Sequence, residues 1–404
     1  MVFDDSHRAA ETEKVPLWRD DRVWKIVFQI VVAAIVVGII ALFAVNLNRN
    51  LARQGIQFSF NFLGNTAGFS IGETAIPYSS SDTYIKAIFV GFVNTLRVIV
   101  VGFVLTTLLG ILAGIASFSD NWLLRKISLV YVEIVRNTPL LLQLIFWYFP
   151  ILLSLPPPSE QLHVLGLMYM SKTGVYLPWP TIGANFWLSL VLLLGLAIAA
   201  WVVSSRRTKL MVETGASGQP QLTALIGIGI VAFLIVAIGF QWQVPFSPEP
   251  AILDNGRAAP TQVENGLRLS LEYIAILVGL VVYTGAFIAE IVRGGIQAVS
   301  TGQWEASRSL GLSQRNVMFL VVLPQALRVI IPPLNSQYMN LAKNSSLALA
   351  IGYPDLFSVS STALNQTGRP VEVFIILMST YLIINLLISL AMNGLNRSVQ
   401  FKER

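Results

Sequence analysis

The chain has 404 residues, of which 54% are hydrophobic and only 12% are charged. Soluble proteins carry about 25% charged residues, so this composition excludes a soluble protein and indicates a polytopic membrane protein. The formal charge of +6 gives no reason to expect a nucleic-acid partner, because the basic residues sit in short loops where they orient spans. With no cysteine and two distant histidines, the sequence suggests neither a disulfide nor a His-based metal cluster.

The chain opens with a polar, basic segment, 1–25, followed by the apolar run 26–47. The apolar core of a cleaved signal peptide has about 7–15 residues, so this longer run predicts a retained span. Seven further apolar segments are long enough to cross a membrane. In order, the eight predicted spans are 26–47, one within 86–117, a third that begins after Lys126, 182–203, 222–240, 269–292, 316–339 and 371–395.

The segments between the spans are polar and rich in turn residues. We expect 49–83 to be an exposed loop, 156–180 a Pro-containing loop, and 241–266 a further polar loop. Residues 215–220 are typical of a linker. The mixed segment 341–370 has short apolar patches, which predict a half-inserted helix.

Eight spans place both termini on one side, and the distribution of basic residues indicates which side. The N-terminus, the three loops on its side and the C-terminus hold sixteen Lys and Arg, against seven in the longer opposite loops. Cytoplasmic loops carry the excess of Lys and Arg, so both termini and the segment 294–315 are expected in the cytoplasm.

One stretch, 283–333, combines the end of one apolar segment, a polar segment punctuated by glycine, and the start of another apolar segment. Its middle predicts a short amphipathic helix, with apolar residues at roughly helical spacing and Gly311 as a left-handed stop. A helix this short needs a partner surface to be stable. The residues expected at that surface are Trp304, Glu305, Ala306, Ser307, Arg308, Leu310, Gly311 and Leu312.

The triplet Glu305-Ala306-Ser307, followed by Gly311 and Leu323-Pro324, resembles the EAA loop of ABC importer permeases. Ser307 replaces the usual second Ala. The surrounding sequence is similar to the polar amino-acid uptake branch, and 46–73 resembles the longer permease subunit of the general L-amino-acid importer. The resemblance implies an all-α membrane protein with a type I importer permease core, about eight spans and extra peripheral helices.

The resemblance covers about 86–154 and 267–396, which are expected to form the two parts of the permease core. The second part contains a cytoplasmic coupling helix, 302–313. Outside the core lie the N-terminal segment 1–25, the extra first span with its external loop, 26–85, an insertion with two extra spans, 155–266, and the cytoplasmic tail, 397–404. The fourth and fifth spans lack ionisable residues between 181 and 203 and between 222 and 241, which predicts peripheral packing.

The resemblance also implies partners: a cytosolic ABC ATPase dimer, a second homologous permease that forms a heterodimer with this chain, a periplasmic or extracellular amino-acid-binding protein, and an amino-acid substrate. No Lys follows a Gly, so the P-loop signature is absent and the chain itself is expected to bind no cofactor. ATP and Mg²⁺ would be bound by the ATPase, and this chain would not be an enzyme. The expected location is the bacterial inner membrane.

An amino-acid zwitterion needs an acceptor for its ammonium group and donors for its carboxylate. Broken helices supply such donors, and Pro139 predicts a break beside Asn137 and Thr138. A second place, 341–346, resembles the family's L-K-D-[ST]-S segment, with Asn344 in place of Asp, so neutral or polar amino acids are the expected substrates. The candidate substrate-binding residues are Asn137, Thr138, Gln143, Glu290, Lys343, Asn344 and Ser345.

Two alternatives remain open at the level of sequence. A stand-alone secondary amino-acid transporter would also have eight spans, but it would need its own coupling site and no docking helix. An intramembrane enzyme would need paired catalytic groups at depth, and no Asp lies within the predicted spans. Identification of co-purifying chains would discriminate between these classes.

Overall fold

The computed structural model describes residues 21–53, 58–214, 219–247 and 263–400. Contacts divide the chain into Met1–Phe62 and Leu63–Arg404. The first unit contains one long helix, α1 (Asp21–Arg53), whose part Val23–Asn50 is apolar enough to span a membrane. Most of the predicted N-terminal segment, the start of the 215–220 linker, much of the loop 241–266 and the end of the tail lie outside the described residues.

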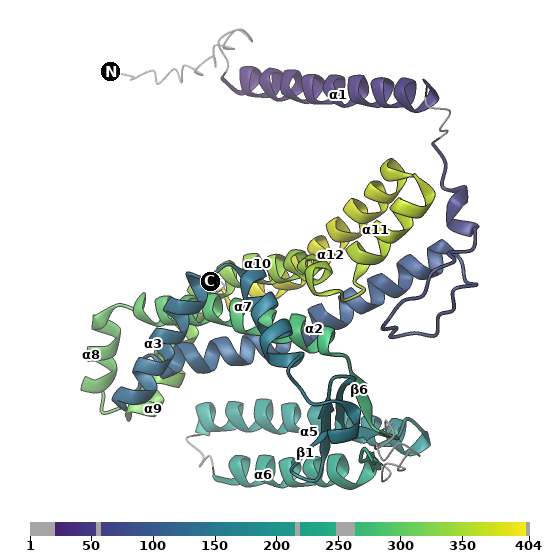
Figure 1. The fold of residues 1–404 in the computed structure, drawn as a ribbon. Coiled ribbons are helices and arrows are strands. Elements are labelled where there is room, and N and C mark those ends of the chain that lie inside the picture. Colours follow the sequence, from purple (N-terminus) through teal and green to yellow (C-terminus); the bar gives the residue numbers. More distant parts are fainter. Residues whose placement is uncertain (1–20, 54–57, 215–218, 248–262, 401–404) are drawn as a thin grey trace, which may run out of the picture. The chain divides into compact units, whose positions relative to one another are not determined.

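The second unit is mainly helical (Figure 1). The described residues contain seven helices long and apolar enough to cross a membrane, or eight if one bent pair counts as a span, which confirms the predicted number. The long helices of this unit are α2 (Tyr84–Ala116), α5 (Ala184–Thr214), α6 (Gln219–Leu234), α7 (Leu271–Gln297), α10 (Leu323–Asn344) and α12 (Pro370–Val399).

The predicted third span is broken. It consists of α3 (Trp122–Arg136) and α4 (Leu140–Phe146), which continues as the π-helix η3 (Trp147–Leu152), and the two parts are bent by 107°. Pro139 lies at the break, where its ring and missing N–H prevent a continuous helix. The sequence predicted a break at Pro139 but not the change in direction.

The helices α2 and α7 pack closely because small residues line their contact. A Cβ added to Gly110 would lie 2.5 Å from Ile288 Cγ2, and one added to Gly114 would lie 2.7 Å from Val292 Cβ. Small residues spaced four apart let membrane helices approach at backbone distance. Residues of α2, α4, α7, α10 and the 3-10 helix η7 (Ser345–Ile351) form one buried apolar cluster at this contact.

The predicted loop 156–180 instead contributes four strands to two small antiparallel sheets. The strands β1 (Leu162–Val164), β2 (Met168–Ser171), β3 (Gly174–Leu177) and β6 (Leu267–Leu269) pair in that order, and β4 (Trp179–Pro180) pairs with β5 (Trp242–Gln243). Three residues, 165–167, connect β1 to β2. Leu165 and Gly166 have positive φ, 54° and 69°, in a turn closed by a bond from the Leu167 N–H to the Val164 carbonyl at 3.1 Å. The sequence predicted a Pro-containing loop and missed these strands, because strands of two to four residues are too short to show a clear pattern.

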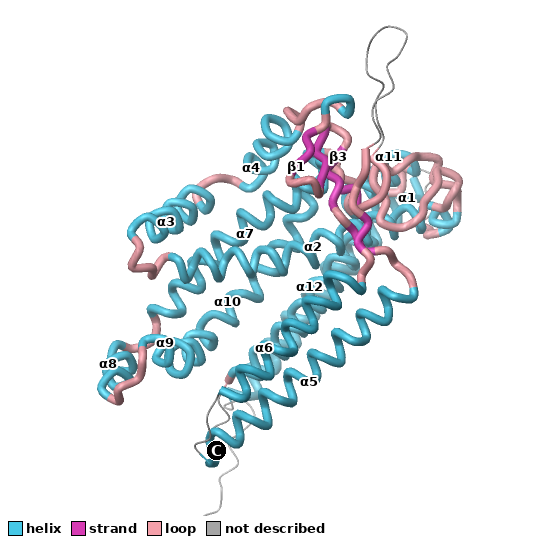
Figure 2. Tube along the Cα trace, turned by 90° about the horizontal axis from the view of Figure 1, so that it is seen from below, coloured by secondary structure: helices cyan, strands magenta, loops and turns pink. Residues whose placement is uncertain are grey.

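The two ends of α7 carry different structures. The sheet precedes it through β6, whereas α8 (Thr301–Ser309) and α9 (Gln314–Asn316) follow it, and Figure 2 shows them at opposite ends. The π-helix η6 (Val317–Val322) leads from α9 into α10. The remaining short elements are η2 (Asn61–Gly64), η4 (Pro158–Glu160), η5 (Ile235–Gly239) and α11 (Leu356–Thr367).

Candidate functional site

The polar stretch after α7 folds as predicted into a short helix with a glycine stop. Gly311 has φ of 75°, its N–H donates to the Arg308 carbonyl at 2.9 Å, and the Leu312 N–H donates to the Ser307 carbonyl at 3.3 Å. These two bonds are the pattern of a Schellman motif, which needs a left-handed residue after the helix. Helix α8 therefore ends at Ser309, and the last residues of the predicted range 302–313 form the cap.

The helix α8 has one covered and one uncovered face. Ser307 is buried, and Trp304 and Leu312 pack against the apolar cluster formed by α7, η6 and α10. Ala306 and Leu310 are exposed, Leu310 to 81%, and the charged Glu305 and Arg308 flank them. Two of the four apolar residues expected to need a partner thus find one in this chain, and the other two remain available to a second protein.

A polar pocket of about 470 Å³ lies between α3 and α7. Its lining combines two acidic and two basic side chains with one amide and three apolar groups. These residues are Leu129, Val132, Glu133, Arg136, Asn137, Phe287, Glu290 and Arg293. The structure therefore brings Asn137 and Glu290, two of the predicted site residues, to one pocket.

Glu290 is the centre of the charged side chains in this pocket. Its Oε1 lies 2.6 Å from a terminal nitrogen of Arg293, and its Oε2 lies 3.7 Å from Arg136. The Arg136 guanidinium also lies over the Phe287 ring, 5.2 Å from its centroid. An ammonium group that binds Glu290 would compete with both guanidinium groups. The two arginines were missed as site residues, although the spacing of Glu290 and Arg293 predicts an ion pair.

Gln143 and Thr138 brace the break in the third span. Pro139 cannot donate to the Val135 carbonyl, and the Gln143 side-chain amide donates to that carbonyl at 3.0 Å and to the Thr138 carbonyl at 3.1 Å. The Thr138 hydroxyl donates to the Ile134 carbonyl at 2.8 Å. Gln143 is buried, and its amide N–H groups are engaged in this brace rather than directed at a pocket.

The other three predicted residues lie at the end of α10. Ser345 is buried and donates to the Ala342 carbonyl at 2.8 Å, whereas Lys343 is exposed and Asn344 is partly exposed. Lys343 continues a stripe of exposed residues along one side of α10, because positions three and four apart share a helix face. The α10 stripe consists of Val329, Pro332, Pro333, Ser336, Asn340 and Lys343.

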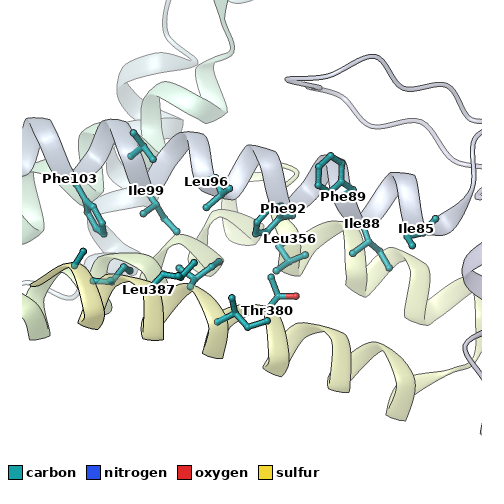
Figure 3. Close-up of a pocket in the computed structure, with 15 residues that line it drawn as sticks. Ile85, Ile88, Phe89, Phe92, Leu96, Ile99, Phe103, Leu356, Thr380 and Leu387 are labelled. Carbon is teal, nitrogen blue, oxygen red and sulfur yellow. The ribbon is translucent and has the colours of Figure 1, made fainter. Parts of the chain in front are cut away.

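A second cavity, of about 610 Å³, is a groove between α2, α11 and α12 (Figure 3). Its lining is aliphatic and aromatic, with Thr380 as the only hydroxyl-bearing side chain. A zwitterion there would lose hydration without gaining hydrogen bonds, which costs several kcal/mol or more for each charge. This groove therefore lacks the chemistry of an amino-acid site.

Sequence comparisons with known proteins identify the family to which the chain belongs. The family model described as binding-protein-dependent transport system inner membrane component matches residues 228–401. The chain is 43% identical to a putative amino-acid ABC transporter permease of Escherichia coli over 95% of both chains. It is 39% identical to a general L-amino acid transport system permease of Rhizobium johnstonii over 95% of this chain and 94% of the other.

The chain is also similar to a third permease and, in its fold, to a solved structure. The chain is 37% identical to the glutamate/glutamine/aspartate/asparagine transport system permease of Rhodobacter capsulatus, over 95% of this chain and 96% of the other. A solved structure, described as an amino acid ABC transporter with histidines, aligns with a TM-score of 0.45 and 20% identity. It covers 78% of this chain and 95% of the other. The three full-length relatives decide the family.

Proposed function

The chain belongs to the amino-acid ABC transporter permeases, and on that premise we propose that it forms half of the membrane pathway of an ATP-driven amino-acid importer. The other half would be a related but different permease, the pairing implied by the resemblance to the longer permease subunit. A binding protein outside the cell would deliver the substrate, and a cytosolic ATPase dimer would bind ATP and Mg²⁺. The chain is a multi-pass membrane protein, and we place it in the bacterial inner membrane with both termini in the cytoplasm.

The observation that carries this proposal is the α10 stripe. Within a helix that is long and apolar enough to span the membrane, Ser336, Asn340 and Lys343 are exposed on one face. Polar and charged groups are costly against lipid and normally face protein or water. A second permease and a water-accessible pathway along α10 would satisfy this face, whereas a monomer surrounded by lipid would not.

The charged pocket between α3 and α7 is the proposed place where the substrate charges are recognised. Its two arginines suit a carboxylate and its two glutamates suit an ammonium group. Asn137, Thr138 and Gln143 would hold the broken span that shapes the pocket. Lys343 and Asn344 would face the pathway at the end of α10, and the buried Ser345 would hold the end of that helix. Neutral or polar amino acids fit this balanced charge.

Coupling would occur through the exposed face of α8. Ala306 and Leu310 would enter a depression on the ATPase, with Glu305 and Arg308 at its rim. The covered face fixes α8 to the cluster of α7 and α10, so a displacement of α8 would be transmitted to both helices. The α10 stripe lines the proposed pathway, so movement of the ATPase would change the access of substrate to that pathway.

The test is affinity purification of the tagged chain in mild detergent, followed by reconstitution and uptake measurement with a mixture of L-amino acids. We expect an ATPase and a second permease to co-purify, and uptake to require ATP inside the vesicles. The Glu290→Gln variant should assemble normally and transport at least tenfold more slowly, because the pocket loses a carboxylate that would bind the ammonium group, a charge-assisted bond of about 1.5–3 kcal/mol. ATP-independent uptake by the isolated chain would instead identify a secondary transporter.

A further inference from the structure

A second polar pocket, of about 510 Å³, lies at the start of α7, at the end of that helix opposite to α8. Two arginines and one glutamate contribute its charged groups, so its formal charge is positive. The lining residues are Gly72, Glu73, Thr74, Ala75, Arg97, Leu267, Arg268 and Ser270. Nothing in the proposed translocation site uses these groups, and the family resemblance gave them no role.

The short segment 72–75, here called the strap, is tied down at its backbone. The Asn94 side-chain amide donates to the Glu73 carbonyl at 2.9 Å, and Asn94 Oδ1 accepts from the Ala75 N–H at 3.2 Å. Asn94 is fully buried and also donates to the Pro354 carbonyl at 2.9 Å. These two bonds attach the strap to α2, and its Glu73 side chain lies over the pocket. The contacts of the Glu73 carboxylate add to this attachment, so their loss is expected to increase the mobility of the strap.

The Glu73 carboxylate occupies a receptor for carboxylates. One oxygen lies 2.5 Å from the Arg97 guanidinium, and the other accepts from the Ser270 hydroxyl. Ser270 is the N-cap of α7, so the carboxylate also lies at the positive end of a 27-residue helix. The Arg97 guanidinium is stacked over the Tyr273 ring at 3.9 Å, which fixes its plane. The Arg97 guanidinium, the Ser270 hydroxyl and the N-terminus of α7 all stabilise a bound carboxylate.

The second guanidinium of the pocket has no acidic partner among the described residues. Arg268 donates to the Thr173 carbonyl through Nε at 3.0 Å and through a terminal nitrogen at 2.8 Å. These bonds position the group without neutralising its charge. The pocket thus holds one cation matched by Glu73 and one unmatched cation, in a space large enough for a small organic anion.

We propose that this pocket is an external site for the carboxylate of an incoming amino acid. Arg268 would attract that carboxylate, which would then displace the Glu73 carboxylate from Arg97, because both ligands have the same chemistry. Glu73 is thus a built-in ligand that closes the site when no amino acid is present and is released when one binds. This inference rests on the proposed function for the identity of the ligand.

The test uses the absence of cysteine in the natural sequence. A spin label on a Thr74→Cys variant of the full chain, reconstituted with its co-purifying subunits, reports the mobility of the strap. The probe is a mixture of the L-amino acids, and the control probe is the same mixture as α-carboxamides. We expect saturable mobilisation by the amino acids and no response to the amides. A label on a Ser81→Cys variant, in an exposed part of the same loop, should respond to neither.

Substitution of the two arginines separates their roles. Arg97→Gln should mobilise the strap without any probe, and Arg268→Gln should raise the half-saturating concentration about tenfold, as expected for one lost charge-assisted interaction. Lys86→Gln, which breaks the partly exposed Asp82–Lys86 pair at 2.8 Å outside the pocket, should leave the response unchanged.

Three results would overturn the inference: equal mobilisation by the amides, an unchanged half-saturation in Arg268→Gln, or a response that requires the binding protein and not the free amino acid. The last result would assign the site to an acidic side chain of that protein. Uptake measured in the same vesicles distinguishes failure of the external site from failure of the proposed importer function. Normal uptake without a strap response refutes the external site alone, whereas a saturable response without uptake refutes the proposed function alone.

Discussion

Gly311 combines an open environment with a backbone conformation that favours glycine. A Cβ at this position would meet no atom within 4 Å, so a substitution there acts through the left-handed backbone, with φ of 75°, and through the surface offered to a partner. An L-residue in this conformation costs about 1 kcal/mol or more.

The Gly311→Asp variant should reach the membrane in normal amount but lose uptake, because its altered cap and added charge prevent α8 from entering the ATPase. Uptake, pull-down of the ATPase and substrate-stimulated ATP hydrolysis in the reconstituted complex measure this. Gly302→Ala is the control, since Gly302 lies in α8 itself without a positive φ or a close neighbour, and this variant should transport normally. Full coupling in Gly311→Asp would show that the coupling element lies elsewhere.

Asp355 is a buried carboxylate at the N-cap of α11, outside the candidate spans. Burial raises the pKa of its carboxyl to about 7, although its bond from the Ser358 N–H acts in the opposite direction. The folded chain therefore retains the proton at pH values where the unfolded chain, with an Asp pKa of about 3.9, has lost it. The Asp355 contribution to stability must fall as the pH rises from about 4 to about 7 and stay constant above that.

We expect Asp355→Asn to remove this part of the pH dependence, because Asn keeps the helix cap of α11 and cannot ionise. Thermal unfolding in detergent between pH 5 and pH 8 measures it as a smaller decrease in Tm with rising pH. Asp355→Ala should also remove the dependence but lower Tm throughout, by the loss of a cap that contributes about 1 kcal/mol. An unchanged slope in both variants would contradict a role for Asp355 in the pH dependence.

At the scale of elements, the contact between α2 and α7 determines whether the core can form. Gly110 and Gly114 allow Ile288 and Val292 to lie against the backbone of α2. The break between α3 and α4 depends on a comparable local fit, in which Gln143 replaces the hydrogen bond that Pro139 cannot make.

Gly110→Leu should sharply reduce the amount of folded chain in the membrane, because the added side chain needs space now filled by Ile288. We expect a loss of several kcal/mol, the usual result of severe overpacking at a close helix contact. Fluorescence-detected size-exclusion of a tagged chain measures the folded fraction. Gly229→Leu on α6 is the control, because a Cβ there meets nothing within 4 Å. Similar folded fractions for both variants would refute the packing argument.

At the scale of the whole molecule, the main expectation is the orientation in the membrane. The structure places the sheet and the α8 helix at opposite ends of α7, and the basic residues favour the α8 end in the cytoplasm. The exposed residues Ser79 and Ser309 mark these two sides.

A Ser79→Cys variant should react with a membrane-impermeant maleimide in intact cells, whereas a Ser309→Cys variant should react only after permeabilisation. The natural chain has no cysteine, so the unsubstituted protein provides the blank. Reaction of the Ser309→Cys variant in intact cells would reverse the proposed topology. Reporter fusions after Ser70 and Ser171 should read external in the same cells.

The sequence by itself determined the eight apolar segments, the short helix before Gly311 and the family resemblance. These follow from local properties: the length of apolar runs, helical spacing, and the need for a left-handed residue at a helix end. It also predicted interruption of the third span at Pro139, because the restrictions of proline act within a few residues along the chain.

Only the tertiary structure decided how distant side chains share their charges and contacts. Glu290 contacts Arg136 of the distant helix α3. The contacts of Glu73 with Arg97 and Ser270 likewise join three separate parts of the chain. The covered face of α8 likewise depends on α7 and α10. Such contacts join residues far apart in sequence, and their energies depend on burial and direction, which no local pattern encodes.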